Sequence, residues 1–262
     1  MSHPLRKHST KKVPTWPSYR GESHFVGVSP GGWVTVYVDP RLGTPGFQNA
    51  ADLLSDADRV VGINNQIFST PTEPVSVIVF ALHGATDGSG GADHLGCTFE
   101  SGGAIEVCAS FGNPARVSGL FEAELSECSM NGSLCGFSTG EALSRWCAAV
   151  VSNNALADFA SAPDWADAGM PDFVTKTEHS DTNPISIGCG MAFISWLISN
   201  GHKLPKIAQD MVELGDAGTL ADLYEKLSGN SADRAWHEFK KAIDALPGGV
   251  TSDDPFGGFP PM

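Results

Sequence analysis

The stretch that decides the fold is Phe121-Glu122-Ala123-Glu124-Leu125-Ser126-Glu127, which lies within an apolar pattern at residues 117–128. At about 100° per residue, the apolar side chains of this pattern fall on one arc of a helix. Glu124 falls inside that arc and Glu127 lies at its border, whereas Glu122 points to the opposite side, where we expect solvent. A carboxylate on a core-facing stripe needs a partner, a metal or a raised pKa, so this helix is predicted to carry the function.

Two interpretations of this carboxylate helix remain open. Glu124 and Glu127 lie one helical turn apart, and such neighbours raise each other's pKa, which suits general acid–base catalysis. In the alternative, the role is structural, and Glu124 caps a neighbouring segment or pairs with a buried arginine such as Arg145 or Arg116.

Different patterns lie on the two sides of this helix. Before it, short β-branched or apolar runs predict strands at residues 33–38, 75–82 and 104–108, and residues 45–68 have the spacing of an amphipathic helix. After residue 113 the patterns are those of helices only. Strands followed by helices are typical of the α+β class.

This order predicts how the chain divides into parts. We expect a mixed β-sheet lobe at residues 24–112, a mainly helical lobe at residues 113–246, and a cleft where the two lobes meet. Residues 1–23 are basic and without periodicity, which predicts a flexible arm, and residues 247–262 are predicted to be a loose tail.

The charge balance and the hydropathy exclude two kinds of partner. The formal net charge is −14, although residues 1–20 hold five of the 16 basic residues, so the remainder of the chain is strongly acidic. Because an acidic surface repels phosphate backbones, no nucleic-acid partner is expected. No apolar run of about 18 residues occurs, so no membrane partner is expected either. The sequence does not determine the oligomeric state.

Six cysteines lie in the middle of the chain, and an even number is typical of disulfide-bonded proteins. Among several open connectivities, the spacing favours Cys97 with Cys108, Cys128 with Cys135, and Cys147 with Cys189. Disulfides indicate an oxidising compartment. Because residues 1–23 lack the apolar core of a signal peptide, we expect a secreted or periplasmic protein whose leader is not present in this chain.

The carboxylate helix resembles the active-site helix of zincins of the gluzincin type, metallopeptidases whose zinc motif is His-Glu-x-x-His. In the same frame this chain reads Ala123-Glu124-Leu125-Ser126-Glu127, and Ala104 to Ser110 stands at the place of the family's edge strand. The resemblance implies a zincin-like fold and retains Glu124 as the base. Alanine cannot coordinate a metal, so no zinc is expected in the usual site.

A second element of that family also resembles part of the chain. Residues 165–173 match its Trp-x-x-Glu-Gly-x-Ala-x-Tyr element at the tryptophan, the glycine and the aromatic end, with Ala168 at the position of the third ligand. Glu141 is a competing match for that ligand. Both imidazole positions are therefore replaced. The third ligand position is either Ala168, which cannot coordinate a metal, or Glu141, which can.

Further polar residues are candidates for the cleft. The catalytic candidates are Glu124, Glu127, His94, Glu141 and Asp167, where His94 is the expected partner of the carboxylates. The substrate-binding candidates are His83, Trp165 and Asp172. No metal ligand is predicted, although Asp87, Ser89 and Asp93 alternate as in a calcium loop that lacks the closing glutamate.

These observations predict an extracellular hydrolase that uses Glu124 with Glu127 on a peptide or polysaccharide substrate, without the usual zinc site. Peptide cleavage follows from the family resemblance, and glycan cleavage follows from the paired carboxylates. The alternative is a catalytically inactive zincin-like protein with a binding or structural role.

Overall fold

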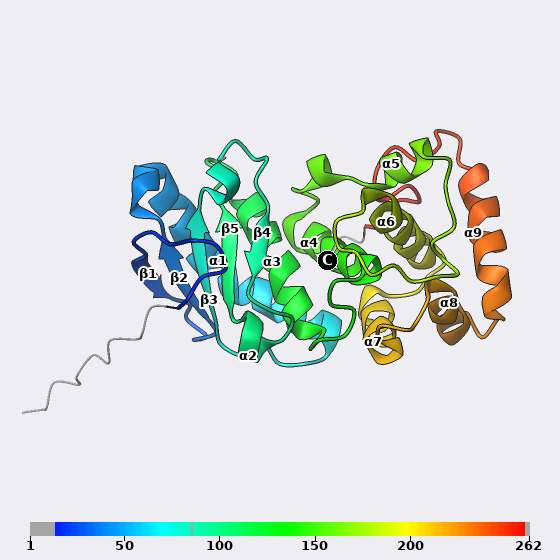
Figure 1. Cartoon of the computed structure of the whole chain (residues 1–262), viewed down its shortest axis with the longest axis horizontal. Coiled ribbons are helices and arrows are strands. Elements are labelled where there is room, and N and C mark those ends of the chain that lie inside the picture. The colour runs from blue at the N-terminus through cyan, green and yellow to red at the C-terminus, as the bar shows by residue number, and fades with distance from the viewer. Residues whose placement is uncertain (1–13, 85, 260–262) are drawn as a thin grey trace, which may run out of the picture.

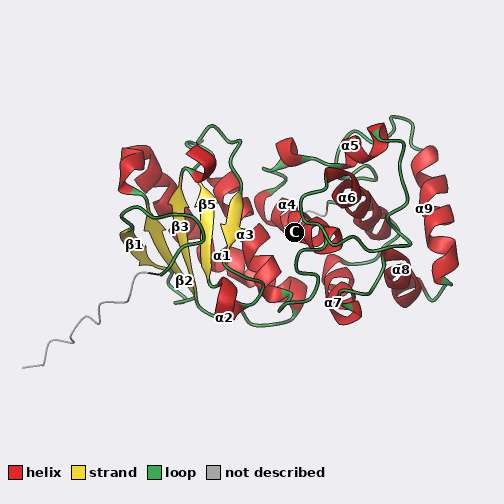
Figure 2. Cartoon of the chain, viewed as in Figure 1, coloured by secondary structure: helices red, strands yellow, loops and turns green. Residues whose placement is uncertain are grey.

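The structure, a computed structural model, describes residues 14–84 and 86–259. A β-sheet lies at one end of an elongated molecule, and a group of helices lies at the other end (Figure 1). Strands and helices are largely segregated along the chain, with the sheet complete before the helical part begins (Figure 2). The predicted α+β class is therefore confirmed.

The sheet has five strands in the order β1-β2-β3-β5-β4. The strands are β1 (His24–Val28), β2 (Val34–Val38), β3 (Val75–Phe80), β4 (Ala92–His94) and β5 (Ala104–Cys108). The three inner strands run parallel to one another, and each outer strand is antiparallel to its neighbour. The sheet is therefore mixed, as predicted.

The edge of the sheet differs from the prediction. The inner strands are those that the apolar runs predicted, because a strand buried on both faces is apolar almost throughout. The sequence patterns predicted neither β1 nor β4. Because β4 pairs with β5, residues 104–110 do not form the edge of the sheet, and the edge strand beside the carboxylate helix is β4.

Two helices contact the sheet and each other: α1 (Gly43–Phe68) and α3 (Pro114–Ser129). The carboxylate helix α3 begins where Asn113 accepts a hydrogen bond from the backbone N–H of Arg116, with Pro114 in the first turn, as the sequence predicted. The apolar arc of α3 is buried, which fixes the direction of its remaining side chains.

Glu122 corrects the expectation that its side of α3 faces solvent. Its side chain is fully buried, and within the described residues neither of its carboxylate oxygens has a hydrogen-bond partner. The reason is that α1 and α4 (Ser138–Ser152) both pack against α3, and Glu122 lies close enough to Arg59 of α1 and Cys147 of α4 to raise the pKa of each. Burial raises the pKa of Glu122 well above its ordinary value, and the positive charge of Arg59 on α1 opposes this only in part.

Apart from α2 (Phe99–Gly102), which lies by the sheet, the remaining helices build the other end of the molecule together with α6 (Pro184–Ser199), which is buried along most of its length (Figure 1). They are α4, α5 (Ala162–Asp167), α7 (Leu204–Leu214), α8 (Leu220–Ser228) and α9 (Ala235–Asp244). Within the described ranges, none of the helices combines the length and apolarity that crossing a bilayer requires.

The segment before β1 packs against the sheet. Of the arm expected over residues 1–23, residues 1–13 lie outside the described residues. Trp16 and Tyr19 are buried, and the fully buried carboxylate of Glu106 on β5 accepts hydrogen bonds from both the backbone N–H and the hydroxyl of Ser18 and from the N–H of Tyr19. This part of the arm is therefore held in place.

The segment after α9 also packs against the protein as far as it is described. The carboxylate of Asp254 accepts hydrogen bonds from the hydroxyl of Ser195 and from the backbone N–H groups of Gly258 and Phe259. The ring of Phe259 contacts the buried ring of Trp146, with 4.4 Å between the ring centroids. Residues 260–262 of the expected tail lie outside the described residues.

Candidate active site

A cavity of about 560 Å³ lies beside the carboxylate helix α3. Its walls come from β4 and the loop that follows, from α3 and α4, and from segments far along the chain, including Asp181 and Asp253. His94, Glu124, Glu127 and Glu141 all line it. Four of the predicted catalytic residues, from three elements, are therefore brought together.

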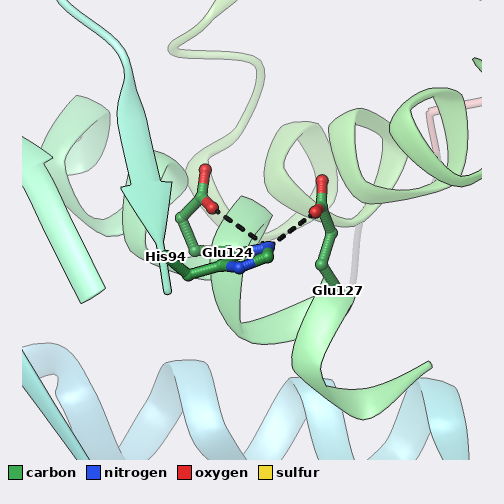
Figure 3. A group of neighbouring side chains, drawn as sticks. All are labelled: His94, Glu124 and Glu127. Carbon is green, nitrogen blue, oxygen red and sulfur yellow. Dashed lines mark hydrogen bonds and ion pairs between the residues drawn. The ribbon is translucent and has the colours of Figure 1, made fainter. Parts of the chain in front are cut away.

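The centre of the site is a cluster of one imidazole and two carboxylates (Figure 3). His94 Nε2 lies 2.8 Å from an oxygen of Glu127 and 3.6 Å from an oxygen of Glu124. Glu124 and Glu127 are three residues apart on α3, so their side chains leave the helix on the same side. His94 ends β4, whose pairing with β5 places it over α3.

The cluster is largely shielded from solvent, and this burial controls its charge. The side chains of His94, Glu124 and Glu127 are 10%, 13% and 24% exposed. Burial, and then the negative charges of Glu127, Glu141 and Asp93, raise the pKa of Glu124 well above its ordinary value. Glu124 is therefore protonated at a pH where an exposed glutamate is ionised.

The other two groups respond to the same surroundings. Burial raises the pKa of Glu141 to about 7; the positive charge of Arg145 opposes this rise, and the negative charge of Glu127 adds to it. For His94, burial alone lowers the pKa, but the hydrogen bond to Glu127 and the nearby carboxylates outweigh burial and raise it. The site thus holds several groups whose proton affinity is increased.

The two arginines considered as structural partners of Glu124 pair with other acids. Arg145 Nε donates a hydrogen bond of 2.7 Å to Glu141, and the guanidinium of Arg116 pairs with Asp158. Within the part of the chain that the structure describes, the charged contact of Glu124 is the one with His94. The expected guanidinium partner is therefore absent from Glu124 among these residues.

Three predicted site residues do not line the cavity. Trp165 is fully buried, stacks on the ring of Phe239 and donates its indole N–H to the carbonyl of Pro171, so it belongs to the core. Asp167 is exposed at the end of α5, and Asp172 accepts hydrogen bonds from backbone N–H groups in its own loop. Trp165, the tryptophan that matches the zincin element, therefore lies in the core and not in the cavity.

His83 lies in a short 3-10 helix after β3, and its side chain is outside the described part of the structure, so its substrate-binding role stays a prediction. Sequence reasoning missed other cavity residues, including Asp181 and Asp253. Asp253 accepts hydrogen bonds from the backbone N–H groups of Ser161 and Ala162 at the start of α5. Because these residues lie in loops without periodicity, no sequence pattern marks them.

The residues present do not fit the zinc site that the zincin resemblance implies. At the two positions where the resemblance implies imidazoles, Ala123 lines the cavity but offers only a methyl group, and Glu127 offers a carboxylate. Of the two candidates for the third ligand, Ala168 is exposed and lies away from the cavity, whereas Glu141 lines it. The side chains that do converge are His94, Glu124 and Glu127, which offer ligand atoms within 4.8 Å of one another.

The calcium prediction concerns residues 87–93, the first of which form a turn held by hydrogen bonds within the loop. Asp87 accepts hydrogen bonds from both the backbone N–H and the hydroxyl of Ser89, which forms a turn. Asp93 lies on β4 and lines the cavity. A calcium ion at this loop stays a prediction.

One disulfide joins two walls of the cavity. Cys97, in the loop after β4, is bonded to Cys135, in the connection between α3 and α4, and both residues line the cavity. The expected pairs Cys97–Cys108 and Cys128–Cys135 are therefore wrong. Cys147 and Cys189 are buried thiols, so their expected pairing is wrong too. The correct pair is remote in sequence and is brought together only by the fold.

No family model matches the sequence, and no curated protein does either. Among solved structures, the chain is similar to the M1 zinc metallopeptidase from Deinococcus radiodurans, with 12% identity and a TM-score of 0.45 over 83% of this chain and 51% of that chain. A mutant of that enzyme gives 11% identity and a TM-score of 0.43 over the same shares of the two chains. Yeast LTA4 hydrolase in complex with Bestatin gives 14% identity and a TM-score of 0.41 over 87% of this chain and 38% of that chain. The chain thus spans about half the length of these structures or less.

Proposed function

We propose that the chain is an extracellular hydrolase that cleaves a peptide by acid–base chemistry of Glu124 with Glu127, without the zinc site of the zincins. The observation that carries this proposal is the position of Glu124, which faces a cavity of about 560 Å³ beside a second carboxylate and an imidazole. Arg145 and Arg116 are both engaged with other acids, so neither neutralises Glu124. The disulfide between Cys97 and Cys135 supports an exported protein.

The two carboxylates have different roles in this proposal. Hydrolysis of an amide requires one group that accepts a proton from water and one that donates a proton to the leaving nitrogen. Burial among negative charges raises the pKa of Glu124, so in this proposal Glu124 is the proton donor and not the base that the zincin resemblance implies. Glu127 is held by the hydrogen bond to His94 and accepts the proton of water. His94 therefore positions the acceptor.

A zincin-like division into a sheet lobe and a helical lobe, with the cavity as part of their cleft, belongs to the same proposal. The order of the elements supports it, since α3 follows the sheet directly and the other helices follow α3. The edge strand β4 lies beside α3, and both contribute to the cavity.

A second candidate function is the cleavage of a glycan. A glycosidase needs two carboxyl groups that flank the sugar from two sides, which neighbours on one helix face cannot easily provide. Glu141 favours this candidate, because it comes from α4, lines the same cavity and has a raised pKa. In this case Glu141 is the proton donor opposite the carboxylates of α3.

The deciding variant is Glu124→Gln, which keeps the shape of the side chain and removes its acid–base chemistry. Turnover of peptide and glycan libraries should fall by about 10²–10⁴. Asp167→Asn is the matched control, because it removes an exposed carboxylate that does not line the cavity. Equal turnover by the wild type and the Glu124→Gln variant would remove Glu124 from the mechanism.

The inactive alternative predicts a different result for the same variant. If the carboxylates only stabilise the fold or bind a ligand, the wild type shows no turnover, and Glu124→Gln changes the free energy of unfolding instead. The ion pair between Arg145 and Glu141 is of a kind that structural sites also contain. A folded, fully stable Glu124→Gln variant that loses activity excludes this alternative.

A further inference from the structure

We propose that His94, Glu124 and Glu127 form a binding site for one divalent transition-metal cation, such as zinc or manganese, at the wall of the cavity (Figure 3). This inference goes beyond the proposed function and does not depend on it. The site is not the one that the zincin resemblance implies, because its imidazole comes from β4 and the two imidazole positions of α3 hold Ala123 and Glu127.

The distances within the cluster fit the coordination sphere of such a cation. Ligand atoms about 2.1 Å from an ion, at the angles of tetrahedral or octahedral coordination, lie about 3.0–3.4 Å from each other. The distances from His94 Nε2 are 2.8 Å to Glu127 and 3.6 Å to Glu124, on either side of that range. All three ligand atoms lie within 4.8 Å of one another, so the carboxylates of Glu124 and Glu127 close around the ion when it binds.

The charge around the cluster also favours a cation. Acidic side chains outnumber basic ones in the lining of the cavity. The basic residues are His94 and Arg145, and the acidic residues are Asp93, Glu124, Glu127, Glu141, Asp181 and Asp253. Arg145 donates a hydrogen bond to Glu141, so its charge offsets that of one acid outside the cluster. A dication between Glu124 and Glu127 offsets the repulsion of two carboxylates that share a buried site.

The ligand set indicates the class of cation. Calcium and magnesium prefer oxygen ligands throughout, whereas an imidazole combined with carboxylates suits zinc, manganese or iron. The three protein ligands leave positions open toward the cavity, where water completes the coordination. Nδ1 of His94 is buried without a hydrogen-bond partner among the described residues, so the ring lacks the support that strong sites provide. We therefore expect weaker binding than at a structural zinc site.

Isothermal titration of the chelator-treated wild type with Mn²⁺, and the visible spectrum with Co²⁺, test the site. We expect one cation per chain, with an affinity that falls at least about 100-fold in Glu124→Gln and in His94→Gln. Asp181→Asn is the matched control, because it removes a cavity carboxylate outside the cluster and should change the affinity by less than about tenfold. Thermal unfolding of each variant without metal confirms that it is folded.

Two results overturn the proposal. The first is a wild type that binds neither Mn²⁺ nor Co²⁺ at about millimolar concentration, which is decisive even if a variant fails to fold. The second is equal affinity in the folded variants and the wild type, because the cation then lies elsewhere. A change in the Co²⁺ spectrum that disappears in the His94→Gln variant supports an imidazole ligand, which a non-specific acidic surface does not supply.

Turnover, measured in the same samples, separates this inference from the proposed function. A cation that engages both Glu124 and Glu127 removes the proton donor and the proton acceptor, so the loaded protein should lose activity if the proposed function is correct. Binding that raises turnover leaves the cation site in place and overturns the metal-free acid–base roles. Turnover by a protein that binds no cation overturns the cation site and leaves the proposed function intact.

Discussion

The three glutamates of α3 show how surroundings give one residue type different properties. Glu124 and Glu127 lie on the side that faces the cavity and His94, as their spacing predicted. Glu122 lies on another side, and the sequence predicted solvent there because a single helix pattern contains no information about neighbours. In the structure α1 and α4 pack against α3, and Glu122 is buried without a hydrogen-bond partner among the described residues.

Replacing Glu122 with glutamine should make the free energy of unfolding depend less on pH. Burial raises the folded-state pKa of Glu122 above its unfolded value of about 4.3, so the folded state holds a proton that the unfolded state has lost. The wild type therefore loses stability by at most about 1.4 kcal/mol per pH unit as the pH rises from the unfolded pKa to the folded one. Glutamine does not titrate, so the variant escapes this loss.

Urea unfolding at about pH 5 and at about pH 8 measures this difference. The gain in stability from Glu122→Gln should be larger at the higher pH. The exposed Glu73→Gln variant is the control, and its stability relative to the wild type should be the same at both values. A Glu122→Gln variant whose gain in stability is the same at both pH values would show that folding does not raise the pKa of Glu122.

At the scale of elements, the sequence predicted those whose patterns are long. The strand at residues 75–80 and the helix α3 were predicted because apolar runs and capping residues mark them. The strand β4 was not, because it has three residues in a glycine-rich loop and depends on pairing with β5. Since β4 carries His94, the sequence suggested the partner of the carboxylates but could not place it.

The attachment of the N-terminal segment to β5 depends on Glu106. Its carboxylate accepts three hydrogen bonds from Ser18 and Tyr19, and its side chain is fully buried. Glu106→Ala leaves these donors without an acceptor, so we expect a loss of about 3 kcal/mol or more in the free energy of unfolding by urea. Glu22→Ala, at an exposed position next to the same segment, should change it by less than about 0.5 kcal/mol.

At the scale of the whole molecule, the cavity is assembled from segments that are distant in sequence. The predicted residues Glu124, Glu127 and Glu141 reach it because α3 and α4 pack closely together. Asp253 reaches it from beyond α9, and only the complete fold places it there. Local patterns therefore identified the residues on regular elements and missed those on loops.

The disulfide should contribute strongly to the stability of this assembly. It closes a loop with a sequence separation of 38 residues. The loss of chain entropy in the unfolded state for such a loop corresponds to about 4 kcal/mol. The double variant Cys97→Ala/Cys135→Ala should therefore unfold at a lower temperature than the wild type. A reductant should lower the wild-type melting temperature toward that of the variant and leave the variant unchanged, and an unaffected wild type would contradict this expectation.

The bond between Cys97 and Cys135 also makes a covalent ring that contains β5 and the whole of α3. A protease that nicks the backbone once anywhere inside this ring produces two fragments that remain joined through sulfur. The two fragments cannot diffuse apart, and the broken chain can re-form its native contacts. A single backbone cleavage therefore does not separate the part of the molecule that carries Glu124 and Glu127. Among the described residues, no disulfide encloses α6 to α9 in the same way.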